Sequence, residues 1–363
     1  MASSEVGAAF AADSRADKGL SEAPTEGELR QVLGHYPLGE LEAIQRAEQG
    51  FVNENWIVNT ARGRFFVKRR HPRLRQPDLI RAQHELIGHL RQSGFPAPTI
   101  VPTITGETFL TLDQECYEMQ EYIDGRPFDH DRPGHLEEAA LTLGRYHTLV
   151  AGLAPPALCR PSELHSPTTA RSLLAHLAET WHLEEDPPAE GIARELDAQL
   201  ADIATRFAGP GALPHLVIHG DYYADNLIFD GNRIIGVLDY DKACWQARVL
   251  ELAEALIYFA SPRPGYTKHI VYPGVPNWDA FVRFLQAYAQ TATVEKRELE
   301  VLPDYMRGIW LSASLQRLVE TEDCPNGPFE VLQEVLELAH WARANADQMV
   351  EVGQAAIATS LGR

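Results

Sequence analysis

The chain has 363 residues with 45% hydrophobic and 23% charged side chains, which is typical of a globular protein long enough for two or three domains or one two-lobed enzyme. Lys and Arg total 32 against 51 Asp and Glu, so the formal net charge is −19. This charge argues against nucleic acid or an anionic membrane as the main partner. It favours a neutral or cationic small substrate, although a solvated acidic surface explains it equally well.

The chain shows no targeting or disulfide pattern. Its four cysteines are widely spaced without a CxxC pair, and no apolar run approaches the length of a membrane span. A reducing, cytoplasmic location is therefore the simplest expectation. We expect residues 1–27 to be a disordered tail, residues 28–123 a nucleotide-binding β lobe, and residues 124–363 a helical lobe for catalysis and substrate binding.

The first lobe is expected to be rich in strands. Residues 51–60 and 63–70 are β-branched and aromatic runs around a short turn, which predicts a hairpin. Apolar residues at helical spacing then predict a helix in 77–95, with Asp78 as its cap and Gly94 and Pro96 at its end. Two further strands are predicted at 107–112 and 116–123.

The second lobe is expected to be mostly helical. Apolar residues three and four apart predict helices near 135–150, 167–182 and 189–208, and again from about 247 to the end. Three short strand-like pieces, LVIHG, NLIFD and RIIGVLDY, interrupt this pattern. The Pro- and Gly-rich loop 261–277 either flanks a substrate pocket or is a surface excursion.

The stretch VIHGDYYADNLIFDGNRIIGVLDYD at 217–241 places acidic side chains beside apolar segments. Asp221 lies five residues before Asn226, and Asp239 follows across a hairpin turn at 230–232. A buried carboxylate is costly without a donor, a cation or a metal ion. Mg²⁺ needs hard oxygen ligands, and a hydroxyl nucleophile needs a carboxylate that accepts its proton.

The pattern HxDxxxxN followed by a strand-end Asp resembles the catalytic loop and metal-binding motif of the protein-kinase-like fold. With HGDYYADN, QGFVNEN (49–55), MQEYIDG (119–125) and LGRYH (143–147), the chain resembles the aminoglycoside phosphotransferase, choline kinase and homoserine kinase superfamily, and most of all its homoserine-kinase-like branch. The resemblance covers about residues 40–260. It implies an α+β, bilobal protein-kinase-like fold: a small antiparallel β lobe with one helix and a larger helical lobe.

The resemblance also implies roles for individual residues. Asp221 would be the catalytic base, and Asn226 and Asp239 would bind Mg²⁺. Lys68 would contact the phosphates of ATP, and Glu85 on the following helix would hold Lys68 in place. The remaining nucleotide contacts would come from Gly50, Asn53 and Asn55 over the phosphates and from the backbone of Gln120 to Tyr122 at the adenine.

Other polar residues near these motifs have two interpretations. Asp225 and Asp241 either bind the substrate, surround the metal ligands or are solvated at turns, and Glu320 either contributes to the acceptor site or is solvated at a helix end. Glu251 would brace the catalytic loop, as an acid at this place often does in the superfamily. His219 either orients that loop or is a hydrogen-bonded core histidine.

The function that these residues favour is an ATP- and Mg²⁺-dependent transfer of the γ-phosphoryl group to a hydroxyl of a small molecule, such as homoserine or a related amino alcohol. The alternatives are an antibiotic phosphotransferase of the aminoglycoside type, a Ser/Thr protein kinase of the stress-response type, and a non-catalytic nucleotide-binding regulator. Only a few residues, DKACWQA, lie between Asp239 and the next helix, which leaves no room for a peptide-docking segment. The complete set Lys68, Asp221, Asn226 and Asp239 argues against the regulator.

Overall fold

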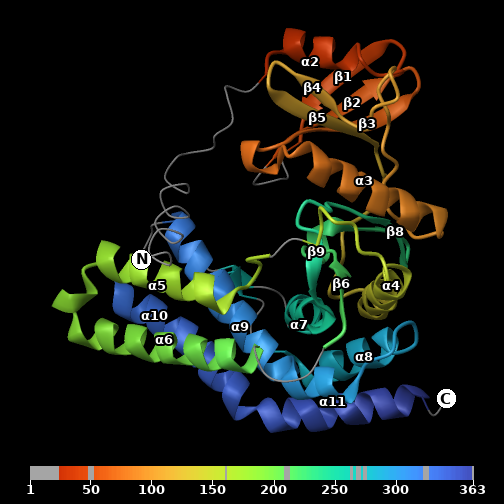
Figure 1. The fold of residues 1–363 in the computed structure, drawn as a ribbon. Helices are drawn as coiled ribbons and strands as arrows, with labels where there is room; N and C mark the ends of the chain where they lie inside the picture. The colour runs from red at the N-terminus through yellow and green to blue at the C-terminus, as the bar shows by residue number, and fades with distance from the viewer. Residues whose placement is uncertain are drawn as a thin grey trace.

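The structure is a computed structural model that describes residues 24–47, 53–159, 162–207, 213–261, 265–266, 271–272, 276–321 and 327–361. A small lobe built on a β-sheet lies above a larger helical lobe, and helix α3 lies between the sheet and the large lobe (Figure 1). The expected bilobal, mixed fold is confirmed. Residues 1–23 of the predicted tail and the predicted phosphate-loop residue Gly50 lie outside the described residues.

The small lobe contains a five-stranded antiparallel sheet in the order β1-β2-β3-β5-β4. Its strands are β1 (Leu41–Arg46), β2 (Glu54–Thr60), β3 (Gly63–Arg69), β4 (Leu110–Leu112) and β5 (Glu115–Glu121). Because side chains alternate along a strand, register decides which residues share a face. Asn55 lies opposite Lys68, and Lys68 lies opposite Glu118, so these three polar residues form a row on one face.

The other face of the sheet is apolar. Trp56, Val67 and Met119 form the neighbouring row and are buried against helix α2 (Glu26–Leu33). The polar row belongs to the face nearer α3 (Pro77–Gln92), where His84 contacts Glu118. The sheet therefore separates an apolar core on one side from a polar cluster on the side of the large lobe.

Three details of the small lobe differ from the sequence-based expectation. Helix α2 was not predicted, so the lobe has two helices rather than one, and the sequence pattern did not locate the strand at β1. Thr25 and Glu28 form a capping box that fixes the start of α2. Asp78 is not the cap of α3, because Pro77 already occupies the first turn and Gln76 is the capping residue; Asp78 instead contributes an acidic side chain within that turn.

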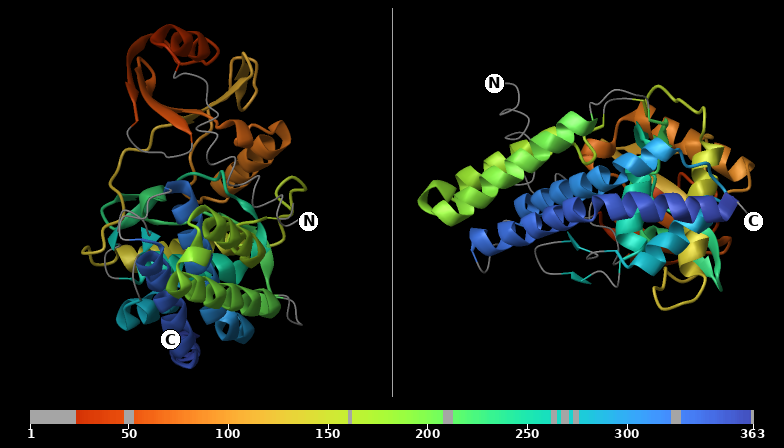
Figure 2. Two further views of the ribbon diagram at one scale, coloured as in Figure 1. Left: turned by 90° about the vertical axis from the view of Figure 1, so that its left-hand side faces the viewer. Right: turned by 90° about the horizontal axis from the view of Figure 1, so that it is seen from below.

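Helices make up most of the large lobe. Their bounds are α4 (His135–Leu149), α5 (Pro167–Thr180), α6 (Pro187–Phe207), α7 (Arg248–Phe259), α8 (Trp278–Tyr288), α9 (Lys296–Thr321), α10 (Pro328–Ala344) and α11 (Ala346–Leu361). Helices α5 and α6, with α10 and part of α9, form an arm that projects from the main body (Figures 1 and 2). Leucines on facing helices, such as Leu196, Leu315 and Leu332, fill the core of this arm.

Short strands carry the polar motifs of the large lobe. The three predicted strand pieces are β6 (His215–Ile218), β7 (Leu227–Asp230) and β8 (Arg233–Val237), and β7 and β8 form the predicted hairpin. An additional strand, β9 (Cys244–Ala247), pairs with β6 and so brings the chain after Asp241 back beside the start of the loop that carries Asp221. Within the Pro- and Gly-rich loop 261–277, the structure describes the two ends and two short strands, β10 (Gly265–Tyr266) and β11 (Val271–Tyr272). Across the described ranges, no helix is both long and apolar enough to cross a membrane.

Candidate active site

The loop after β6 presents Asp221 between the two lobes. The Asp221 backbone N–H donates to His219 Nδ1 at 3.3 Å, which is the loop-orienting contact expected of His219. Asn226 Nδ2 donates to the Asp221 carbonyl oxygen at 2.8 Å and to its carboxylate oxygen Oδ2 at 3.1 Å. Since the amide nitrogen of Asn226 is used in this way, its carbonyl oxygen is the side-chain atom that remains to bind a cation.

A buried chain of hydrogen bonds braces this loop. The Gly220 N–H donates to Glu251 Oε1 at 2.7 Å, and Glu251 Oε2 contacts His147 Nε2 at 2.8 Å. His147 Nδ1 in turn contacts the Tyr288 hydroxyl at 2.6 Å. Burial opposes the ionisation of Glu251, but these hydrogen bonds and the nearby imidazoles outweigh it and lower its pKa. Glu251 thus occupies the bracing position expected from the sequence, and α4, α7 and α8 together fix Gly220.

Asp239 lies just beyond β8 in a strained conformation. Its φ of 63° is in the left-handed region, which non-glycine residues adopt at a cost and often at functional sites. Burial, followed by the nearby carboxylates of Asp241 and Asp221, raises the pKa of Asp239 although Lys68 opposes the shift. Leu238 N donates to Asn226 O at 2.8 Å, so the hairpin returns Asp239 to the end of the catalytic loop.

Lys68 is the cation that faces these acids. Its Nζ lies 3.1 Å from Asp239 Oδ1, 3.1 Å from Asp241 Oδ2 and 3.7 Å from Glu118 Oε1. Burial acts to lower the pKa of Lys68, but these carboxylates outweigh it and raise the pKa above its usual range. A lysine held as a cation between the lobes can contact a phosphate anion there.

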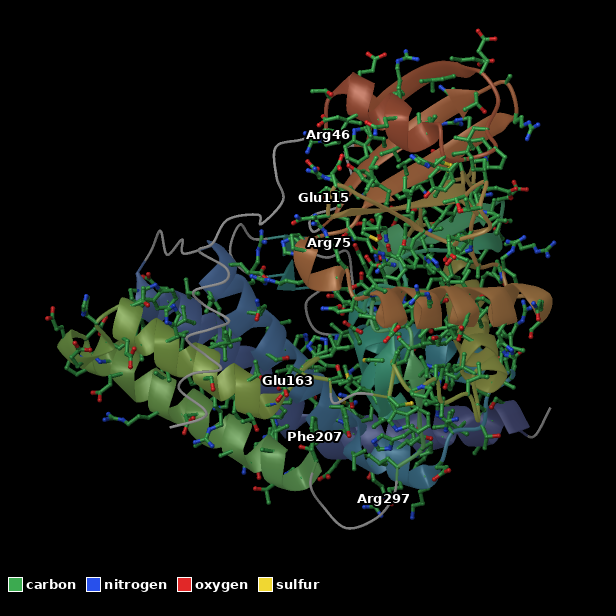
Figure 3. All side chains as sticks on the ribbon, turned by 45° about the horizontal axis from the view of Figure 1, so that its top comes forward. Arg46, Arg75, Glu115, Glu163, Phe207 and Arg297 are labelled. Carbon is green, nitrogen blue, oxygen red and sulfur yellow. The ribbon has the colours of Figure 1, made fainter. Side chains whose placement is uncertain are left out.

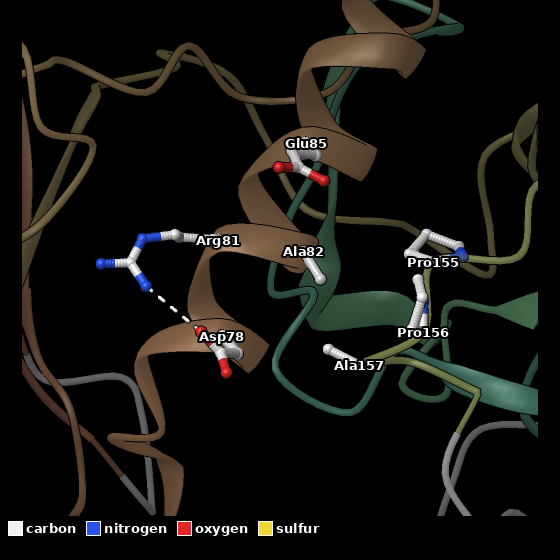
Figure 4. Close-up of a pocket in the computed structure, with 7 residues that line it drawn as sticks. All are labelled: Asp78, Arg81, Ala82, Glu85, Pro155, Pro156 and Ala157. Carbon is white, nitrogen blue, oxygen red and sulfur yellow. Dashed lines mark hydrogen bonds and ion pairs between the residues drawn. The ribbon is translucent and has the colours of Figure 1, made fainter.

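The prediction that Glu85 is the partner of Lys68 is wrong. Glu85 is exposed and shares a face of α3 with Asp78, Arg81 and Ala82, across a hollow from 155–157 (Figure 4). The reason is helical spacing: Gln83 and His84 turn toward the sheet, so Glu85 turns away from it. The small-lobe carboxylate beside Lys68 comes instead from Glu118 on β5, a residue that the sequence analysis did not single out.

Asp241 is not solvated at a turn. It is buried among groups of the small lobe: Asn53 Nδ2 donates to Oδ2 at 2.6 Å, and Arg70 contacts Oδ1 at 3.1 Å. Gln83 Nε2 donates to the Asp241 carbonyl oxygen at 2.9 Å. Burial opposes the ionisation of Asp241, but Lys68 and Arg70 lower its pKa. Asp241 is therefore a contact between the two lobes.

The predicted nucleotide contacts of the small lobe lie along the same region. Asn53 precedes β2 and binds Asp241, and its Oδ1 accepts from the His71 N–H at 2.9 Å. Asn55 lies opposite Lys68 in the sheet. At the end of β5, Gln120 is buried and pairs with Phe66.

One part of the predicted adenine contact is already engaged within the small lobe. The Tyr122 N–H donates to Arg64 O at 3.0 Å, and the Glu121 N–H donates to Thr99 O at 2.9 Å. A nucleotide base at this segment could therefore accept from these two donors only by displacing the Arg64 or Thr99 carbonyl oxygen. The roles of Gln120 and Tyr122 stay predictions.

The two other candidate substrate acids are exposed. No contact brings Asp225 to the Asp221 carboxylate within the described structure, and Glu320 pairs with Gln316 and Arg317 of its own helix. Lys242, which the sequence analysis did not identify, is in direct contact with the predicted catalytic base: its Nζ lies 2.6 Å from Asp221 Oδ1. The signal was present in the sequence, since a lysine directly follows the DYD triplet.

The donor set fits a magnesium ion that is bound mainly by nucleotide phosphates. No three His, Cys, Asp or Glu side chains form a metal cage in the described part of the chain. Mg²⁺ in nucleotide sites typically uses one or two side-chain oxygens together with phosphate and water, so Asp239 and Asn226 are sufficient. The raised pKa of Asp239 supports this fit, because a nearby cation would relieve the repulsion from Asp221 and Asp241.

A carboxylate on a braced loop, an asparagine and a strained aspartate beside it, and a buried lysine on the facing sheet are the arrangement expected of a kinase-type phosphotransferase. The model of the phosphotransferase enzyme family APH matches residues 43–304, and the chain belongs to this family. It is an enzyme that transfers a phosphoryl group to an alcohol.

Known proteins resemble the chain over most of its length. It is 28% identical over 309 residues to a homoserine kinase of Parvibaculum lavamentivorans, a match that covers 85% of this chain and 90% of that protein. A homoserine kinase of Sinorhizobium medicae is 27% identical, with 86% and 90% covered. Among solved structures, the amicoumacin kinase hAmiN has a TM-score of 0.65 at 14% identity, with 90% of this chain and 94% of that chain covered. A microcompartment-associated aminopropanol kinase has a TM-score of 0.61 at 15% identity, with 91% and 98% covered. At these identities the two structures establish the fold alone.

Proposed function

We propose that the enzyme transfers the γ-phosphoryl group of Mg²⁺-bound ATP to the hydroxyl of homoserine or a closely related amino alcohol. The observation that carries this proposal is the position of Asp221, which contacts Lys242 and Asn226 and lies near Asp239, the carboxylate that contacts Lys68. The names of the curated relatives support homoserine as the acceptor.

Each residue would have a distinct task. Lys68 would bind the phosphates, and Asn226 and Asp239 would hold Mg²⁺, which neutralises the charge that develops during phosphoryl transfer. The acceptor hydroxyl would compete with Lys242 Nζ for Asp221 Oδ1 and give up its proton to that carboxylate. The brace from Glu251 would keep the loop in place without touching the substrate.

A protein substrate fits the site less well. Strand β9 begins at Cys244, only a few residues after Asp239, and pairs immediately with β6. The segment that docks peptides in protein kinases would have to lie in this interval. A small acceptor is therefore the better match.

The test is Asp221→Asn, compared with Asp239→Ala. We expect Asp221→Asn to abolish phosphoryl transfer to homoserine while Mg²⁺-ATP binding, measured by calorimetry, stays close to that of the wild type, because the base is lost without loss of a metal ligand. Asp239→Ala should weaken Mg²⁺-ATP binding itself. Near-normal turnover by Asp221→Asn, or label transfer to protein and to none of homoserine, choline, methylthioribose, sugars or aminoglycosides, would contradict the proposal.

A further inference from the structure

Glu254 is a buried acid for which the catalytic roles above give no use. Its side chain is about 7% exposed, and its Oε1 lies 3.2 Å from His165 Nε2. Its second oxygen, Oε2, is buried and has no hydrogen-bond partner among the residues that the structure describes. A buried carboxylate oxygen without a partner costs free energy, so a donor or a cation is expected to satisfy it.

Glu254 lies on the face of α7 that meets the loop carrying Asp221. Glu251, Glu254 and Tyr258 lie three and four residues apart on α7 and so share one face of the helix. Glu251 binds the Gly220 N–H, and the ring of Tyr258 lies 5.7 Å from that of Tyr223. The first and last members of this stripe therefore contact the loop that carries Asp221, and Glu254 lies between them.

The ammonium group of Lys242 pairs with Asp221 and not with Glu254. Its ammonium lies 2.6 Å from Asp221 Oδ1, on the catalytic base. Burial acts to lower the pKa of Lys242, but the carboxylates of Asp221 and Glu254 outweigh it and raise this pKa, so Glu254 acts electrostatically on the same space. No lysine or arginine of the described residues forms an ion pair with Glu254, so a second cation of suitable size could bind its carboxylate.

His165 is held in a defined position beside Glu254. Its φ of 51° is in the left-handed region, and its Nδ1 contacts Ser312 Oγ of α9 at 2.9 Å. The segment before His165 lies against β9, since the Trp245 N–H donates to Leu158 O at 2.9 Å. Glu163, two residues earlier, lies where the arm joins the main body and accepts a hydrogen bond from Thr169 of α5 (Figure 3). His165 therefore links Glu254 on α7 to Ser312 on α9.

We propose that Glu254, oriented by His165, binds the ammonium group of the phosphoryl acceptor and makes the enzyme select amino alcohols over alcohols that lack an amine. This inference rests on the proposed function and names the residue that sets its substrate class. Glu254 acts in specificity and not in the transfer of the proton. An aliphatic ammonium carries three donors, and a buried carboxylate with one unused oxygen is the complementary acceptor.

The experiment compares each amino alcohol with its deaminated counterpart in the full-length enzyme. The pairs are homoserine with 4-hydroxybutanoate, and 1-amino-2-propanol with 2-propanol. Glu254→Gln keeps an acceptor for His165 but replaces the charged oxygen, so the fold is retained. The matched control is Glu195→Gln, because Glu195 also contacts a histidine, His340 Nε2 at 2.6 Å, but on the surface of the arm.

We expect Glu254→Gln to raise KM for the amino alcohol roughly a hundredfold, as expected for loss of a buried charged contact. The KM for ATP and the turnover of the deaminated alcohol should be unchanged, and Glu195→Gln should match the wild type. An amine preference that survives in Glu254→Gln, or a wild type without such a preference, would overturn the inference and leave the proposed function intact.

Failure of the proposed function is recognised separately. If the wild type phosphorylates none of these alcohols, calorimetry of amino-alcohol binding to the Mg²⁺-ADP-loaded protein decides the role of Glu254. If Glu254→Gln abolishes amino-alcohol binding and Glu195→Gln retains it, the result supports the amine site. Absent binding, or binding equal in both variants, would overturn it.

Discussion

Gly220 and Gly231 offer a matched test of how tightly the catalytic loop is packed. Both have positive φ, 76° and 61°, so alanine at either position must adopt a left-handed conformation. They differ in their surroundings. A Cβ at Gly220 would lie 2.5 Å from the Lys242 carbonyl oxygen, whereas a Cβ at Gly231 would meet nothing within 4 Å.

The expected magnitudes follow from this difference. The left-handed conformation costs alanine about 1–2 kcal/mol at each position. In Gly220→Ala the loop and the Lys242 backbone must also move apart by roughly 0.9 Å to reach ordinary contact at 3.4 Å, and such overpacking costs about 1–3 kcal/mol more. A displacement of about 1 Å at Asp221 is expected to lower kcat roughly a hundredfold.

Urea unfolding and steady-state phosphoryl transfer measure both effects on the same preparations. Gly231→Ala should lose a small part of its unfolding free energy and keep its kcat, because it perturbs only an exposed hairpin turn. Gly220→Ala should lose more stability and most of its activity. If the two variants have the same kcat, the packing of Gly220 against Lys242 does not position the loop and the reasoning fails.

Two further predictions concern buried groups of the small lobe. Glu118→Gln leaves Lys68 and Arg70 short of a buried carboxylate, so the free energy of unfolding should fall by about 3–5 kcal/mol at neutral pH. Burial opposes the ionisation of Glu118, but Arg70 and Lys68 hold its pKa well below 4.5, so this loss should be fully present above pH 4.5 and shrink as the pH falls through the lowered pKa. Urea unfolding across this range checks it, and a loss independent of pH would count against it. Burial also raises the pKa of Cys116 to about 12, so iodoacetamide at neutral pH should modify the exposed Cys159 and spare Cys116 in peptide mapping. Equal labelling of the two thiols would be the contrary result.

The sequence was sufficient for the part of the site that is local in the chain. The spacing of Asp221 and Asn226 lies within one loop, and the Asp-Gly-Asn turn brings Asp239 back to Asn226 through a hairpin of fixed length. Turn chemistry and residue spacing determine such short-range geometry. The roles of these three residues in transfer and metal binding stay predictions until the variants are measured.

The parts that the sequence missed depend on register and on long-range contacts. Glu118 shares a row with Lys68 only because β3 and β5 pair at this register, which no local pattern specifies. One signal was available: in CYEMQEYI, strict alternation places Glu118 on the face opposite Tyr117 and Met119, and a charge in a buried strand needs a cation. The place of Glu85 on the helix after β3 predicts that it partners Lys68, but the sequence does not specify which face of this helix meets the sheet.

Asp241 ties the two lobes together through Asn53, Lys68 and Arg70. These groups belong to one lobe, while their common carboxylate belongs to the other. The lobes are therefore poor candidates for exchange between family members as independent modules. A chimera that joins this small lobe to a large lobe with an apolar residue in place of Asp241 would inherit two buried cations and lose one of their counterions, a defect placed where the nucleotide is expected to bind.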